Sequence, residues 1–161
     1  MRHNMMTSMT TLGCAVLLIG AGGILHRAAA QAPVDDKQFI TVAGQSDLAE
    51  IKESELALEK SKNRSVRAFA QRMVKDHHML MTKMKPFAEK YNVPPPVLIS
   101  TAQDTQYSAL KGLTGSAFDK AYIEDAVKDH HEALALFDGE IAGTSDADLK
   151  STVTAGRAVV A

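Results

Sequence analysis

The chain has 161 residues, with 45% hydrophobic and 23% charged side chains, a formal net charge of −1, one cysteine and no tryptophan. This length fits one domain with a hydrophobic core, and the balanced charge, which contains no basic cluster, argues against a nucleic-acid partner. The single cysteine excludes a framework of intramolecular disulfides.

Residues 1–30 have the pattern of a cleaved secretory signal peptide. A weakly basic start precedes an apolar run of 14 residues, Leu12–Leu25, and three alanines at 28–30 offer a cleavage site. The run is shorter than the ~20 apolar residues of a membrane-spanning helix, and a lipid anchor at Cys14 is rejected because most of the run follows this cysteine. We therefore predict export, cleavage after Ala30 and no membrane span in the mature protein.

The mature chain is predicted to consist of a polar leader, residues 31–37, and a single helical domain, residues 38–161. It has 131 residues with 16 basic and 19 acidic side chains and no cysteine. Thiol chemistry is therefore excluded, and the slightly acidic balance again argues against nucleic acid.

Two long helices are predicted in the first half of this domain. The first covers residues 38–62, where Asp47 and Glu50 match a capping box that would allow a break near Gln45. The second covers residues 64–91. Its apolar seam has the alternating spacing of four and three that is typical of packed helices, and it consists of Val66, Ala70, Met73, His77, Leu80, Met84, Phe87 and Tyr91.

Three further helices complete the predicted bundle. A short one covers residues 96–111, and a longer one covers residues 117–141 after a capping box that starts at Ser116. The seam of the longer helix consists of Ile123, Val127, His130, Leu134, Phe137 and Ile141. The last helix begins near Ser145 and is expected to be short and weak because Gly156 interrupts it. Since no stretch alternates as a surface strand would, we predict an all-α antiparallel bundle.

Two Asp-His-His triplets, residues 76–78 and 129–131, contain all four histidines of the mature chain. Each triplet lies in the middle of a long predicted helix, and its first histidine falls on the apolar seam. Adjacent residues on a helix point about 100° apart. We therefore predict that His77 and His130 face inward and that the second histidine of each triplet lies on the flank. If the two helices are neighbours, the inward imidazoles can approach each other across the core.

Three interpretations of the inward histidines are open. Each could hydrogen-bond a carboxylate or carbonyl of a neighbouring helix and so specify the packing. Alternatively, His77 and His130 are metal ligands joined by a carboxylate of the first helix, such as Glu50 or Glu55. Acid–base catalysis is the third. The sequence shows no nucleophile with its base and no glycine-rich phosphate loop, so no catalytic or cofactor-binding residue is predicted.

The type of metal follows from the residues around the triplets. No Glu-x-x-His pair involves these histidines, which counts against a carboxylate-bridged di-iron centre and ferroxidase activity. All four methionines of the mature chain lie between residues 73 and 84. Thioether with imidazole suits copper, although methionine is also an adaptable core filler. The predicted metal ligands are therefore His77 and His130, assisted by Glu50 and Met73.

At these residues the chain is similar to a family of exported bacterial proteins, domain of unknown function 4142, which are often labelled outer-membrane proteins. The matching stretches are FITVAGQSDLAEIKESELALEK (39–60), VRAFAQRMVKDH (66–77) and GSAFDKAYIEDAVKDHHEALALF (115–137). The resemblance implies a ferritin-like bundle and a location in the periplasm or at the outer membrane, and it brings no established activity. Family members look similar at Glu50, Met73, Asp76, His77, Phe118, Asp119, Tyr122, Asp129 and His130.

The resemblance also implies a further histidine in the last helix, but LKSTVTAGRAVVA (149–161) stops about where it is expected. If family members continue beyond this point, the chain is truncated or has lost the last turns of this helix. Part of the apolar seam of the bundle would then be uncovered, and a homo-oligomer could cover it. The leading hypothesis is a non-enzymatic structural, stress-related or interaction role in the periplasm. The alternative is a protein that binds copper or another transition metal through the two triplets, and a ferritin-like oxidase is the third hypothesis.

Overall fold

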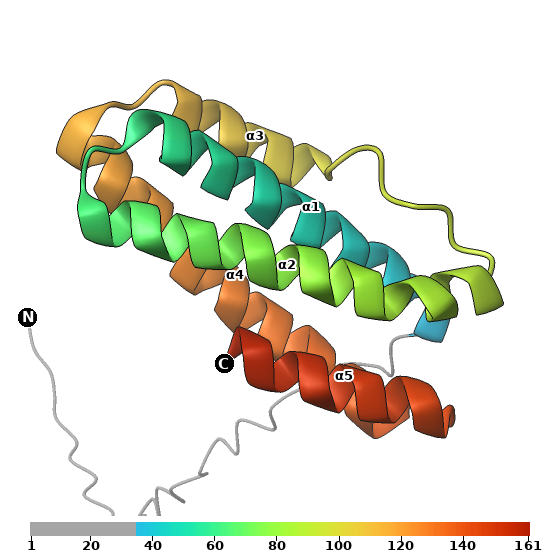
Figure 1. Ribbon diagram of the computed structural model, residues 1–161. Coiled ribbons are helices and arrows are strands. Elements are labelled where there is room, and N and C mark those ends of the chain that lie inside the picture. The colour runs from blue at the N-terminus through green and yellow to red at the C-terminus, as the bar shows by residue number, and fades with distance from the viewer. Residues whose placement is uncertain (1–34) are drawn as a thin grey trace, which may run out of the picture. The chain divides into compact units, whose positions relative to one another are not determined.

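The computed structural model describes residues 35–161, and the part described consists of five α-helices without a strand (Figure 1). In chain order these are α1 (Asp36–Lys60), α2 (Arg64–Lys90), α3 (Thr101–Lys111), α4 (Gly115–Gly143) and α5 (Ala147–Val160). The predicted all-α bundle with a short last helix is confirmed for the described residues. The predicted signal peptide lies outside the described residues, and none of the described helices is long and apolar enough to cross a membrane.

Helix α1 is continuous, so the break that a capping box would allow near Gln45 does not occur. Gly44 lies inside the helix and allows a close approach, because a Cβ atom there would lie 3.4 Å from Cγ of Pro96. The side chain of Asp47 does not cap a helix but bonds to α2, as described below. The helix also begins at Asp36, so the last two residues of the predicted leader are helical.

Helix α2 agrees with its predicted extent and seam. Asn63 precedes it, and its side chain accepts a hydrogen bond from the backbone N–H of Ser65. The seam residues that the structure buries are Val66, Ala70, Met73, His77 and Leu80. Pro86 lies inside the helix and is exposed. The seam of α2 therefore faces the bundle as its spacing indicates.

The next two helices depart from the prediction at their starts. Helix α3 begins at Thr101 rather than at residue 96, because Ser100 and Gln103 form a complete capping box. Helix α4 begins at Gly115 after Thr114, which makes no side-chain cap, so the capping box predicted at Ser116 is wrong.

The buried face of α4 is shifted by one residue from the first part of the predicted seam, whereas Phe137 in its second part is buried as predicted. Val127 is 53% exposed, whereas its neighbour Ala126 is buried. Tyr122 and Phe118, one and two turns before Ala126, are fully buried. The prediction failed because apolar residues occur on more than one side of α4, so spacing alone does not select the inner face.

Helix α5 runs through Gly156 without interruption, contrary to expectation. A Cβ atom at this position would lie 3.0 Å from Phe137 and 3.3 Å from Leu80. Gly156 therefore marks a close approach of α5 to the bundle rather than a break. The helix starts after Asp146, whose side chain accepts hydrogen bonds from the backbone N–H groups of the next turn.

Two hydrophobic clusters divide the core. One contains Phe39, Ile40, Ala43, Leu80, Val93, Phe137, Leu149, Val153 and Val160. The other contains Leu56, Ala57, Val66, Ala70, Leu110, Phe118 and Tyr122. Along α1, buried polar side chains separate the two clusters: Asp47, Glu50, Glu53 and Ser54. A polar layer therefore crosses the middle of the bundle, and the candidate site lies in it.

Candidate metal centre

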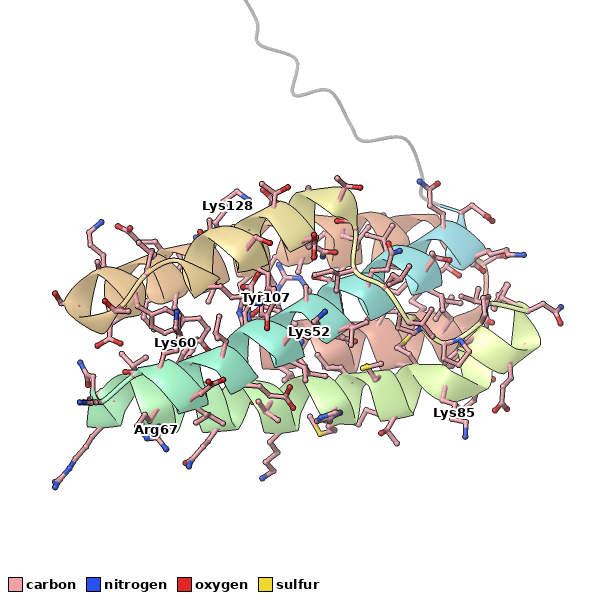
Figure 2. All side chains as sticks on the ribbon, turned by 90° about the horizontal axis from the view of Figure 1, so that it is seen from above. Lys52, Lys60, Arg67, Lys85, Tyr107 and Lys128 are labelled. Carbon is pink, nitrogen blue, oxygen red and sulfur yellow. The ribbon has the colours of Figure 1, made fainter. Side chains whose placement is uncertain are left out.

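Helix α1 brings three acidic side chains into the bundle interior. Asp47, Glu50 and Glu53 are spaced three residues apart and so share one face of the helix. They are 7%, 3% and 1% exposed. Lys52 on the same helix lies outside this row. Its ammonium group lies 5.3 Å from the centre of the Tyr107 ring of α3, and Figure 2 labels both side chains. Burying three carboxyl groups is costly unless donors or cations accompany them.

The two inward histidines meet across the core beside Glu50. His77 of α2 is buried and His130 of α4 is half-buried, and their ring centroids are 5.8 Å apart. Glu50, His77 and His130 each offer one ligand atom, and these three atoms lie within 4.8 Å of one another. Three helices thus place one carboxylate and two imidazoles around a single point.

Hydrogen bonds hold both rings in a defined orientation. Nδ1 of His77 lies 2.8 Å from Oδ1 of Asp47, and Nδ1 of His130 lies 2.9 Å from the backbone oxygen of Val160 at the end of α5. The carbonyl oxygen of Val160 can only accept, so Nδ1 of His130 is the donor. The carboxylate of Asp47 is likewise an acceptor, so Nδ1 of His77 is the donor in that hydrogen bond. The lone pair of each neutral ring then lies on Nε2. This is the outer hydrogen-bonding pattern of histidines that bind metals.

The inner atoms of the cluster have no hydrogen-bond partner among the described residues. Both carboxylate oxygens of Glu50 and Nε2 of His130 are buried and unpartnered. Burial raises the pKa of Glu50 to about 9, with a further contribution from the charge of Glu53. Burial also lowers the pKa of His130, and the neighbouring His77 adds to this effect. Buried polar atoms are normally paired, so these atoms are candidates for binding a cation.

Further acidic groups surround Glu50 and make its neighbourhood negative. Oε2 of Glu53 is buried without a partner, and burial, followed by the charge of Asp129, raises the pKa of Glu53 to about 7. The side-chain amide of Gln106 in α3 donates to Asp129 at 2.5 Å and weakly to Glu53 at 3.4 Å. A cation would therefore be favoured here over an anion.

A small pocket of about 160 Å³ adjoins the two histidines. Its walls include His77, His130 and the buried Met73, together with Leu80 and Val160. An ion held by Glu50 and the histidines would have three protein ligands, and the pocket offers space for a further ligand beside them.

The structure brings together three of the four predicted metal ligands. Glu50, His77 and His130 share one point, and Met73 lies in the wall of the adjoining pocket. Glu55, the other predicted carboxylate, is exposed. His78 and His131 are also exposed, as their flank positions predict.

The methionines do not gather around the site. Met81 and Met84 line a different, largely apolar pocket of about 470 Å³ between α1, α2 and the proline-rich connection. Among the methionines of residues 35–161, Met73 is the one that lines the histidine pocket. Of the methionines considered as copper ligands, only the thioether of Met73 therefore lies next to the histidines.

Sequence reasoning missed two groups that orient the histidines. Asp47 lies three residues before Glu50, so its place on the inner face of α1 could have been read from the spacing. The backbone oxygen of Val160 has no sequence signal, because any residue at this position presents a carbonyl.

The fold and site define the protein as an all-α bundle with a buried Glu-His-His cluster. The chain belongs to the family described as domain of unknown function (DUF4142), whose model matches residues 24–161. The resemblance found in the sequence is thereby confirmed.

A solved structure with a similar fold is the crystal structure of a DUF305 fragment from Deinococcus radiodurans. The two share 17% sequence identity at a TM-score of 0.64, over 80% of this chain and 93% of the fragment. At this identity the likeness concerns the fold alone. Among curated proteins, none matches the chain.

Proposed function

We propose that this protein binds a transition-metal ion through Glu50, His77 and His130. The observation that carries the proposal is the buried Glu50 carboxylate, both of whose oxygens are unpartnered, within 4.8 Å of ligand atoms from two oriented histidines. An ion at this point would stabilise the ionised form of Glu50, displacing its proton, and would give Nε2 of His130 a partner. Neither histidine needs to change its existing hydrogen bond.

The ligand types favour a borderline divalent ion. Two imidazole nitrogens and one carboxylate suit zinc, iron(II) and copper(II), and the mature chain has no thiolate to offer. Met73 in the pocket wall supplies a thioether that suits copper(I). A Met73→Leu substitution that weakens copper(I) but not zinc would assign the thioether to the site.

Elemental analysis of the full-length mature protein, purified without a histidine tag and reconstituted with single metals, tests this proposal. We expect about one equivalent of ion per chain. Glu50→Gln, His77→Ala and His130→Ala should each remove most of it. His78→Ala and Glu55→Gln change exposed residues on the same helices and should retain it.

A content below about a tenth of an equivalent for every metal tested would overturn the proposal. Equal losses from the exposed control variants would overturn the ligand assignment. The histidines would then serve the packing of the bundle, which is the structural role considered first from the sequence.

We also propose that the protein acts outside the cytoplasm, in the periplasm or at the outer membrane. The basic start, the apolar run and the alanines at 28–30 support this location. N-terminal sequencing of protein recovered from a periplasmic fraction should begin at Gln31. Recovery of the uncleaved chain in the cytoplasm would contradict it.

A further inference from the structure

The larger of the two pockets described above is separate from the candidate metal centre. It has a volume of about 470 Å³ and lies between α1, α2 and the connection from α2 to α3. This volume is in the range of pockets that bind small molecules, about 300–1,000 Å³. The two pockets have no lining residue in common, so the larger pocket is a candidate site of its own.

The walls of this pocket are largely apolar. Ile40 contributes to them from α1, Met81 and Met84 from α2, and Val93 with the three prolines 94–96 from the connection. Methionine side chains adapt to bound groups of different shape, whereas consecutive prolines favour an extended backbone. The pocket therefore offers an apolar ligand two helical walls and one extended wall.

The hydroxyl groups in these walls already donate hydrogen bonds. Oγ1 of Thr41 donates to the backbone oxygen of Lys37, and Oγ1 of Thr82 donates to that of His78, both at 2.8 Å. A hydroxyl group has one proton to donate. Gln45 is the remaining neutral polar side chain of the lining. The body of a ligand would therefore be held mainly by burial of apolar surface.

Two charged residues line the pocket, and they lie at different levels along α2. Oδ1 of Asp47 lies 2.8 Å from Nδ1 of His77. Lys85 follows His77 by eight residues, which corresponds to about 12 Å along a helix. The side chain of Lys85, labelled in Figure 2, is 73% exposed, and its ion pair with Glu89 has a distance of 3.9 Å. Exposed pairs of this kind contribute little, so Lys85 supplies a positive charge at the rim.

Exposed apolar side chains adjoin the same pocket. Val97 and Leu98 are 84% and 74% exposed, more than any other large hydrophobic residue in the described part of the chain, and both belong to the lining. Apolar groups that gather on a surface are typical of binding sites. A ligand that fills the pocket and extends to its rim would cover them.

We propose that this pocket binds a single-chain carboxylate of the free fatty acid class. The alkyl chain occupies the apolar groove between the methionines and the prolines, and the carboxylate lies at the rim within reach of Lys85. The positive charge of Lys85 favours an anionic head group over a cationic one. This site goes beyond the proposed metal binding and does not depend on it.

Isothermal calorimetry of the full-length mature protein with decanoate tests the proposal, with a chelator present so that no metal ion binds the carboxylate. We expect one saturable site per chain. Affinity should rise about tenfold from hexanoate to octanoate and again to decanoate, because each buried methylene group adds a similar free energy. Decylamine has the same chain with a cationic head group and should bind about tenfold more weakly than decanoate.

Two variants with matched controls locate the ligand. Thr41→Trp places a large ring in the pocket from an exposed position of α1 and should abolish decanoate binding. Thr154→Trp should retain it, because Thr154 is also an exposed helical threonine that donates to the carbonyl four residues earlier, but it lies outside the pocket. Lys85→Glu should weaken decanoate about tenfold, whereas Lys83→Glu, on the same helix outside the lining, should not.

Absence of saturable decanoate binding at millimolar concentration would overturn the site. Equal affinities for decanoate and decylamine would overturn the assignment of the head group to Lys85, and equal losses in Thr41→Trp and Thr154→Trp would overturn the location. Glu50→Gln should lose transition metal and keep decanoate. This variant therefore separates a failure of the fatty acid site from a failure of the metal centre.

Discussion

The bundle buries two glutamates without hydrogen-bond donors, and their surroundings differ. Glu50 lies in the middle, beside two imidazoles whose outer nitrogens are already bonded. Glu140 lies near the end of α4, where burial and then the charge of Asp36 raise its pKa to about 7. The same residue type in the same degree of burial thus has imidazoles beside it in one place and is affected by the charge of another acid in the other. The neighbours of a buried acid decide what can stabilise it: two imidazoles can bind a cation together with the acid, whereas a neighbouring acid raises its pKa and favours the neutral form.

The largest expected effect is a loss of transition-metal affinity when Asp47, in the middle of the bundle, is replaced. In Asp47→Ala, Nδ1 of His77 loses its acceptor and the ring loses its fixed orientation. Transition-metal affinity should then fall about 10–100-fold, as is usual when an outer partner of a ligand is removed. Competition with a chromogenic chelator measures this. Glu55→Ala is the matched control on α1 and should keep the affinity of the wild type; an equal loss in this control would contradict the orienting role of Asp47.

A smaller effect concerns the pH dependence of stability at the end of the bundle. A glutamate ordinarily has a pKa of 4.5, and Glu140 has a pKa of about 7 in the folded protein. The folded state therefore holds this proton more tightly, so stability falls as pH rises from about 4.5 to 7.

Glu140→Gln should remove this dependence and stabilise the metal-free protein at pH 8 by ~2 kcal/mol, because the buried charge is gone. Urea unfolding in the presence of a chelator, at pH 5 and at pH 8, gives the two free energies. A variant less stable than the wild type at pH 8 would contradict an uncompensated charge at Glu140.

The smallest effect tests the hydroxyl that lies between two acids. Tyr91→Phe removes the O–H group that contacts Asp36 and Asp146. Both acids keep access to water or to Lys90, so the loss in free energy of unfolding should be about 1 kcal/mol. Thermal unfolding measures it. Transition-metal binding should not respond, and a change there would show that the two regions communicate.

The buried face of a helix could be predicted where the apolar residues lie on one side of that helix only. In α2 the spacing of apolar residues gave the buried face correctly, because this helix is polar on its other sides. In α4 apolar residues occur on several sides, so Val127 was chosen where Ala126 is buried. Gly44 and Gly156 resemble helix breakers in the sequence, but each is explained by a neighbour that is distant along the chain.

The residues of the candidate centre also fall into those that the sequence identifies and those that only the structure shows. His77 and His130 could be identified because seam position and repetition mark them. Glu50 was also predicted, but excluding Glu55, the other carboxylate considered, needed the direction in which α1 faces the bundle. The carbonyl of Val160 and the effect of Asp36 on Glu140 depend on which helix ends meet, and no local pattern in the chain carries that information.

The polar layer that separates the two hydrophobic clusters has a consequence for cooperativity. Each cluster can hold its half of the bundle together, while the metal-free layer between them is held by few direct bonds. Such halves can open as separate units. We expect the van't Hoff enthalpy of the metal-free protein to be smaller than its calorimetric enthalpy, and the two to converge once an ion joins α1, α2 and α4. In that case the ion makes two folding units into one.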